Sequence, residues 1–313
     1  MTGAESARAG ALPSVTVVVA TRDRPELLRE ALAAVRDQDY EGSVLTVVVF
    51  DQSPADTSLV SSEARREVQV LSNTREPGLA GSRNTGILAA DSELVAFCDD
   101  DDRWSPSRLS SQVRALAEEP GAVLATCGIR VLYGDHSTQR CLTQRRVHFQ
   151  ELLRSRLTEL HPSTFLAVRR ELLDRVGLVD EHIPGSYAED YDFLLRAARV
   201  HPVVNVPEAL VDIRWHEQSY FTRRWDTIVS ALTWLLEQHP EFSGDRRGEA
   251  RVLGQIAFAE AARGRRRAAV ARAAATLRRN PRELRGVLAL AVAAGAVSPD
   301  RVLRELHHRG RGM

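Results

Sequence analysis

Short apolar runs alternate with amphipathic segments in the first part of the chain. The runs are apolar at most positions, which is typical of strands buried on both faces of a parallel sheet. They predict strands at Val15–Ala20, Val44–Phe50, Val68–Leu71 and Leu94–Cys98. Apolar residues recur at helical spacing in three further segments, at 25–38, at 83–90 and after Pro106. The order of these elements predicts a doubly wound α/β domain, the Rossmann-like arrangement of a nucleotide-binding half.

Beyond about residue 121 the pattern becomes mixed. Short strands are predicted at 123–125, 129–133, 164–168 and 210–213, and helices at 149–156, 170–176 and 189–200. After Trp225 the spacing is helical throughout, interrupted by Pro and Gly. We therefore predict a flexible N-terminus at 1–12, a mixed α/β domain at 13–225 and an Arg- and Ala-rich helical region at 226–313.

Polar clusters directly follow three of the predicted strands. They are the Thr21-Arg22-Asp23 segment, Asp51 and the run Asp99–Asp102. Ligands of open parallel sheets bind beyond the carboxyl ends of the strands. We expect the three clusters to meet in one crevice.

The run Asp99–Asp102 has the most specific chemistry. Four successive carboxylates repel one another unless a cation neutralises them, and hard oxygen ligands suit Mg²⁺ or Mn²⁺. A cation there would stabilise a leaving diphosphate. The alternative is a solvated acidic loop, but the position directly after a buried strand favours the metal site.

Several segments, taken together, resemble family 2 glycosyltransferases, which have the GT-A fold. The acidic run within Phe97–Pro106 resembles the metal-binding DxD segment of that family. Five further segments of this chain resemble other motifs of the family. In chain order they are Thr21–Pro25, Asp51–Asp56, Gly81–Gly86, Glu189–Phe193 and Arg214–Ser219. The resemblance covers roughly residues 14–220. Each motif is weak alone, and their shared order makes the match specific.

This resemblance implies an inverting transfer of a sugar from a nucleotide diphosphate-sugar. It makes Asp190 the general base, and Asp99, Asp101 and His216 the ligands of Mn²⁺ or Mg²⁺. The nucleotide-sugar would contact Thr21, Arg22, Asp23, Asp51, Arg83, Asp99, Asp100 and Glu189. The donor would be linked to UDP, dTDP or GDP, and the acceptor would be a glycan, a lipid-linked sugar, a peptide or a natural product.

Four of these residues also have a purely structural interpretation. Glu189 and Asp190 begin a predicted helix, where acidic side chains are favourable. Arg83 is suited to an ordinary salt bridge, and Asp51 to capping the loop that follows it. The chain also departs from the commonest family pattern. Asp100 stands where a small residue is frequent, and Gln52-Ser53 follows Asp51 where an acidic residue and Gly-Ser are frequent.

Other classes of enzyme fit less well. A sugar-1-phosphate nucleotidyltransferase needs a Gly-rich phosphate loop after the first strand, and Ala20–Arg24 has no Gly. A phosphatase of the haloacid dehalogenase type would place its nucleophilic Asp after the first strand, whereas the acidic run follows the fourth. A dinucleotide enzyme needs a GxGxxG segment near residue 20, and the chain has no such segment there. A catalytically inactive nucleotide-sugar-binding module remains a further alternative.

The cysteines and the distribution of charge indicate where the protein works and what it could bind. Cys98, Cys127 and Cys141 are odd in number and show no metal-binding spacing, which fits a reducing compartment. With no signal-peptide pattern and no apolar run that spans a bilayer, we expect a cytoplasmic protein.

Residues 251–313 hold 14 Arg and 4 acidic residues. That region either packs on the core as helices or forms a basic surface that attracts an acidic acceptor or anionic lipid at the inner face of the membrane. Nucleic acid is not expected, because aromatic residues do not interleave with the arginines.

Overall fold

The computed structural model describes residues 12–134, 136–214 and 224–308. Their contacts divide the chain into two compact units. The first unit comprises residues 1–149, 157–181 and 189–216, and the second comprises 150–156, 182–188 and 217–313. Two short segments before residue 217 belong to the second unit, so the units do not follow one another along the chain. The predicted domain boundary near residue 225 stays a prediction.

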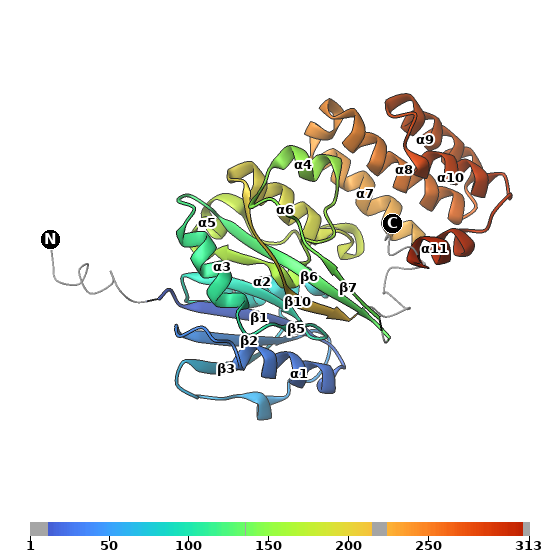
Figure 1. The fold of residues 1–313 in the computed structure, drawn as a ribbon. Helices are drawn as coiled ribbons and strands as arrows, with labels where there is room; N and C mark the ends of the chain where they lie inside the picture. The colour runs from blue at the N-terminus through green and yellow to red at the C-terminus, as the bar shows by residue number, and fades with distance from the viewer. Residues whose placement is uncertain (1–11, 135, 215–223, 309–313) are drawn as a thin grey trace. The chain divides into compact units, whose positions relative to one another are not determined.

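Among the described residues, ten strands form one mixed sheet in the first unit (Figure 1). The central path runs in the order β3-β2-β1-β4-β9-β6-β10-β5, with β7 beside β6 and β8 beside β10. The strands are β1 Val15–Thr21, β2 Val44–Phe50, β3 Arg66–Ser72, β4 Leu94–Asp99, β5 Arg103–Trp104, β6 Leu124–Tyr133, β7 His136–Arg140, β8 Arg146–Val147, β9 Leu166–Val168 and β10 Val203–Arg214. β1 to β4 are parallel, and β9 runs antiparallel between β4 and β6.

Helices cover both faces of this sheet. Alternate residues of β1, β2 and β4 share a core with α1 (Pro25–Arg36) and α3 (Arg108–Ala117). On the opposite face, Phe97 of β4 packs against Phe165 and against Phe193 of α6 (Glu189–Val200). The predicted α/β class is confirmed, and its parallel strands are apolar because both faces are covered.

Two predicted element boundaries were wrong, because the helix and the strand concerned continue through a glycine where a side chain would not fit. Helix α2 is Leu79–Ala89, so it begins before the predicted start at residue 83. Gly81 fits in its first turn, since a Cβ there would lie 2.0 Å from the Glu76 carbonyl oxygen. The strands predicted at 123–125 and 129–133 are one strand, β6. Gly128 lets β6 continue where a Cβ would lie 2.4 Å from the Cys141 sulfur.

Three further segments near the sheet differ from prediction. The strand predicted at 164–168 begins only at Leu166, because Pro162–Thr164 forms a 3₁₀ turn that the His161 side chain caps. The helix predicted at 170–176 is a short α5 (Arg169–Glu171) followed by a π-helical turn at Leu172–Val176. The strand predicted at 210–213 is the end of the longer β10.

The second unit is helical apart from its connections. It contains most of α4 (Phe149–Arg154), then α7 Trp225–Gln238, α8 Arg246–Ala262, α9 Arg266–Arg279, α10 Leu284–Ala293 and α11 Pro299–His308. Helix α8 is buried along most of its length and contacts α7, α9 and α10. None of the described helices is both long enough and apolar enough to span a bilayer.

Candidate functional site

The site begins at the carboxyl ends of three adjacent parallel strands. In the sheet, β1 lies between β2 and β4, and the register pairs Thr21 with Phe50 and Ala20 with Asp99. The Asp51 backbone N–H donates to the Thr21 carbonyl oxygen at 3.0 Å. The polar segments that follow these strands therefore lie at one edge of the sheet.

Residues Asp99–Asp102 form a tight turn at this edge, here called the acidic turn. The Asp102 N–H donates to the Asp99 carbonyl oxygen at 3.2 Å. The Thr21 hydroxyl donates to the Asp100 carboxylate at 2.7 Å. Arg24 donates to Asp100 at 3.2 Å and to Asp101 at 2.9 Å. The start of α1 thus supplies the cation nearest to these two carboxylates, and sequence reasoning had missed Arg24.

The acidic turn holds its negative charges at an energetic cost. Burial, followed by the neighbouring carboxylates, raises the pKa of Asp101. The same causes raise the pKa of Asp102 well above its usual range. Burial also raises the pKa of Asp100, although the Thr21 hydroxyl and Arg24 oppose that effect. A divalent cation at the turn would relieve this repulsion.

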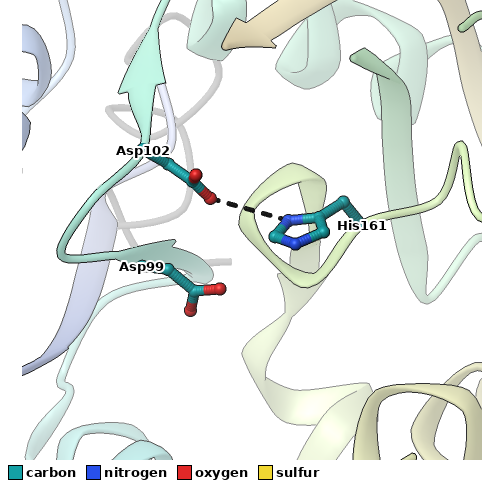
Figure 2. A group of neighbouring side chains, drawn as sticks. All are labelled: Asp99, Asp102 and His161. Carbon is teal, nitrogen blue, oxygen red and sulfur yellow. Dashed lines mark ion pairs between the residues drawn. The ribbon is translucent and has the colours of Figure 1, made fainter. Parts of the chain in front are cut away.

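Three side chains of this region can supply ligand atoms to one metal ion. A carboxylate oxygen of Asp99, one of Asp102 and a ring nitrogen of His161 all lie within 4.8 Å of one another (Figure 2). His161 Nδ1 is 3.6 Å from Asp102 Oδ2. Burial lowers the pKa of His161 despite the nearby Asp99 and Asp190, which favours the neutral ring that binds metals. Carboxylate and imidazole together suit Mn²⁺.

Ser163 organises this group of ligands. Its hydroxyl accepts a hydrogen bond from the Asp99 N–H at 2.9 Å and donates to the Asp102 carboxylate. The Ser163 N–H in turn donates to His161 Nδ1 at 3.3 Å. Sequence reasoning had missed both His161 and Ser163.

A buried arginine joins the acidic turn to helix α6. Arg83 is 2% exposed; it donates to Asp99 at 2.8 Å and to Glu189 at 3.0 Å. Burial alone would lower the pKa of Arg83, but Asp99, Glu189 and also Asp190 raise it. Asp190, the second residue of α6, also helps to raise the pKa of Arg83 and opposes the lowering of the His161 pKa. Residues far apart in the sequence meet at this one site.

Asn84, beside Arg83 on α2, fixes the segment that leads towards α6. Its side chain donates to the Val179 carbonyl oxygen at 2.8 Å and to the Glu181 carboxylate at 2.6 Å. It also accepts from the Val179 N–H at 2.9 Å. Sequence reasoning had not assigned a role to Asn84, although it lies in the same motif as Arg83.

Asp51 is held by the residue that follows it and by the segment between β3 and α2. It accepts hydrogen bonds from Asn73 at 2.8 Å, Gln52 at 2.9 Å and the Gly78 N–H at 3.1 Å. Burial alone would raise the pKa of Asp51, but these hydrogen bonds outweigh it and lower that pKa. Two of the three donors come from the segment between β3 and α2, so capping of the loop after Asp51 and contact with a nucleotide base both remain predictions.

The remaining predicted residues differ in their surroundings. Arg22 and Asp23 are exposed, 3.8 Å apart, and Asp23 has a φ of 54°. A cavity of about 180 Å³ opens beside the ends of β1 and β2; among its lining residues are Thr21, Asp23, Arg24, Phe50 and Ser53. His216 lies outside the described residues. Asp101 pairs with Arg24, and the group of potential ligands described above contains Asp102 in its place.

Comparison with known proteins identifies the family. The model of Glycosyl transferase family 2 matches residues 16–177, which include β1, α2, the acidic turn and His161. The chain belongs to this family. The predicted family and the predicted class, glycosyltransferase, are confirmed.

Most of this glycosyltransferase is also similar to part of a longer protein. The O-antigen biosynthesis protein RfbC of Myxococcus xanthus is 32% identical over 252 residues, which are 76% of this chain. The chain spans only 19% of that relative's length.

Two solved structures support the fold. TarS 1–349 of S. aureus in complex with UDP-GlcNAc has a TM-score of 0.60 at 16% identity, covering 95% of this chain and 92% of that one. Mannosyltransferase PcManGT from Pyrobaculum calidifontis, in complex with GDP-Man and Mn²⁺, has a TM-score of 0.56 at 20% identity, covering 94% and 83%. The predicted GT-A type of fold, with its helical C-terminal region, is confirmed.

Proposed function

We propose that this family 2 glycosyltransferase transfers a sugar from a nucleotide diphosphate-sugar to an acceptor hydroxyl, with inversion at the anomeric carbon. The observation that supports this most directly is the position of Arg83. Its bridge between Asp99 and Glu189 places the acidic turn beside the start of α6, which carries Asp190. A leaving-group site and a base on neighbouring elements are what an inverting displacement needs.

The nucleotide-sugar occupies the edge of the sheet beyond β1, β2 and β4 in this proposal. TarS and PcManGT, which share the fold, were solved with UDP-GlcNAc and with GDP-Man. We propose Thr21, Arg22, Asp23 and Asp51 as contacts of the nucleotide, and Asp99 and Asp100 as contacts of the ribose or diphosphate. Arg83 and Glu189 are both buried and paired with each other. In this proposal they fix the position of the acidic turn relative to α6.

A divalent cation, Mn²⁺ or Mg²⁺, fits the acidic turn. Asp99 belongs to both of the ligand sets considered: the structure groups it with Asp102 and His161, and the family resemblance with Asp101 and His216. Burial and the neighbouring carboxylates raise the pKa values of Asp101 and Asp102, so their charged forms are disfavoured unless a cation is bound. When bound, such a cation neutralises the negative charge that develops on the leaving diphosphate.

Asp190 takes the proton in the proposed reaction. As the acceptor oxygen forms its bond to the anomeric carbon, the acceptor's hydroxyl proton passes to the Asp190 carboxylate. The bond to the diphosphate breaks on the opposite face of the sugar, and its electron pair leaves with the nucleoside diphosphate. The Arg83 ion pairs tie Glu189, the first residue of α6, to Asp99, and this link supports the proposed placement of the Asp190 carboxylate beside the acidic turn.

The acceptor in this proposal is the hydroxyl of a glycan, free or linked to a lipid. The name of the Myxococcus relative, which refers to O-antigen biosynthesis, supports this choice. We found no observation that favours a nucleotidyltransferase or an inactive binding module over a glycosyltransferase.

The stereochemistry of the product tests this function. Full-length protein would be screened by thermal shift against UDP-, dTDP- and GDP-sugars with and without Mn²⁺. The stabilising donor would then be incubated with oligosaccharide acceptors, and the new linkage analysed by NMR. We expect an α-linked donor to stabilise the protein only when Mn²⁺ is present and to give a β-linked product. Retention of configuration, or equal stabilisation with EDTA, would contradict the proposal.

A further inference from the structure

Arginine dominates one stretch of the C-terminal helical unit. Residues 265–282 contain seven arginines and no acidic residue. They are Arg265, Arg266, Arg267, Arg272, Arg278, Arg279 and Arg282, and all are exposed. This stretch comprises α9 and the link to α10, and it accounts for much of the excess positive charge of the C-terminal region.

Among the described residues, most of these guanidinium groups have no acidic partner. Within the part of the chain that the structure describes, Arg279 pairs with Glu249 at 3.1 Å, and the other six have no carboxylate partner. Arginines that served only to tie helices together would have such partners. An exposed run of unpaired cations instead attracts an anionic surface.

Large apolar side chains are exposed beside these arginines. Val270 on α9 is 48% exposed, and Leu284 and Val287 on α10 are 68% and 50% exposed. At about 100° per residue, Val270 lies on the same face of α9 as Arg267 and Arg278. Leu284 and Val287 lie on one face of α10, opposite its buried Ala289 and Ala293.

The two exposed faces belong to neighbouring helices. α9 and α10 contact each other, and both pack on the buried helix α8 (Figure 1). Their outer faces therefore both point away from α8. We call the combined face the Arg–Leu face: Arg267, Val270, Arg278, Arg282, Leu284 and Val287.

We propose that the Arg–Leu face docks on the surface of an anionic lipid bilayer. Guanidinium groups would meet the lipid headgroups while the three aliphatic side chains enter the boundary with the acyl chains. A nucleic acid would match the charge but leave Leu284 and Val287 in water. A second copy of the same face would place arginines against arginines, which repel. This role goes beyond sugar transfer and leaves the proposed catalytic residues unchanged.

Vesicle co-sedimentation of the full-length protein tests the docking. The probes are vesicles of phosphatidylcholine alone and vesicles that contain about a third phosphatidylglycerol. We expect the protein to sediment with the anionic vesicles only. The triple variant Arg267→Gln/Arg278→Gln/Arg282→Gln should bind about a hundredfold more weakly, at roughly fivefold for each arginine. Leu284→Ser/Val287→Ser should lose the part of the binding that survives high salt.

A matched control separates the face from net charge. Arg36→Gln/Arg114→Gln/Arg170→Gln removes the same charge from exposed positions of the other unit and should bind like wild type. Melting temperatures of all variants would verify folding. Absence of wild-type binding to anionic vesicles, or an equal loss in the control variant, would overturn the proposal. Concentration-dependent dimerisation that the face variants abolish without vesicles would also overturn it, in favour of self-association.

Discussion

At the scale of single residues, Asp102 shows how the acidic turn depends on pH. Its side chain is 2% exposed, and burial and neighbouring carboxylates raise its pKa well above the usual range. Between the ordinary Asp pKa of about 3.9 and this raised value, the native protein binds a proton that the unfolded chain has released. The contribution of Asp102 to stability therefore falls as the pH rises through the raised pKa, provided that no metal is bound.

The variant Asp102→Asn tests this environment. Asn cannot ionise and still offers an oxygen to the Ser163 hydroxyl. In EDTA, the melting temperature of the variant relative to wild type should be nearly unchanged around pH 4. It should rise by several degrees towards pH 8, since 1 kcal/mol corresponds to about 2–4 °C in a chain of this size class. A melting-temperature difference between variant and wild type that stays constant with pH would show that ionisation of Asp102 does not destabilise the native protein.

At the scale of elements, α2 determines how the acidic turn and α6 are held together. Arg83 contacts Asp99 and Glu189, and Asn84 holds the segment at Val179 and Glu181. The motif that contains these two residues was found in the sequence, where Arg83 was predicted to contact the nucleotide-sugar, with a salt bridge as the alternative. Both of its contacts in the structure are to buried or half-buried protein carboxylates. We therefore treat Arg83 as a positioning residue.

Substitution of Arg83 by lysine should expose this role. Lysine keeps the charge but lacks the planar fork that reaches two carboxylates. One of the two partners would lose a charged hydrogen bond, at a cost of about 1.5–3 kcal/mol in unfolding free energy. We expect kcat to fall at least about tenfold through misplacement of Asp190, with a smaller change in donor KM. The control is Arg114→Lys on the exposed side of α3. An unchanged kcat in Arg83→Lys would remove Arg83 from the positioning of α6.

At the scale of the whole molecule, the sequence predicted what local pattern determines. The apolar runs of β1, β2 and β4 identified the parallel half of the sheet, and chain order placed Thr21, Asp51 and Asp99 at one edge. His161 and Ser163 were missed because they reach the acidic turn through long-range pairing. β9, which follows them, inserts antiparallel beside β4, and no local spacing signals this insertion.

The division into units was hidden from the sequence for the same reason. Segment 150–156 belongs to the helical unit although it precedes much of the first unit in the chain. It packs there because Gly248 of α8 approaches the Leu153 carbonyl so closely that a Cβ would lie 2.5 Å from it. A single glycine in an otherwise helical pattern does not reveal its distant partner.

The most direct test of the proposed mechanism is the comparison of Asp190→Asn with Asp192→Asn. Both substitutions remove one negative charge from the first turn of α6. Asp192 is paired with Arg196 at 2.8 Å and serves as the matched control for helix stability. Asn at position 190 keeps the size of the side chain but cannot accept the acceptor's proton.

Transfer rate, donor affinity and melting temperature would be measured on one preparation of each variant. If Asp190 is the general base, kcat of Asp190→Asn falls about 10²–10⁴-fold while donor affinity stays near that of wild type. Asp192→Asn should melt at a lower temperature and keep most of its turnover. If Asp190 acts only as a favourable charge at the helix N-terminus, its loss costs up to about 1 kcal/mol of stability and little activity. Turnover by Asp190→Asn above a tenth of the wild-type rate would contradict the assignment of Asp190 as the base.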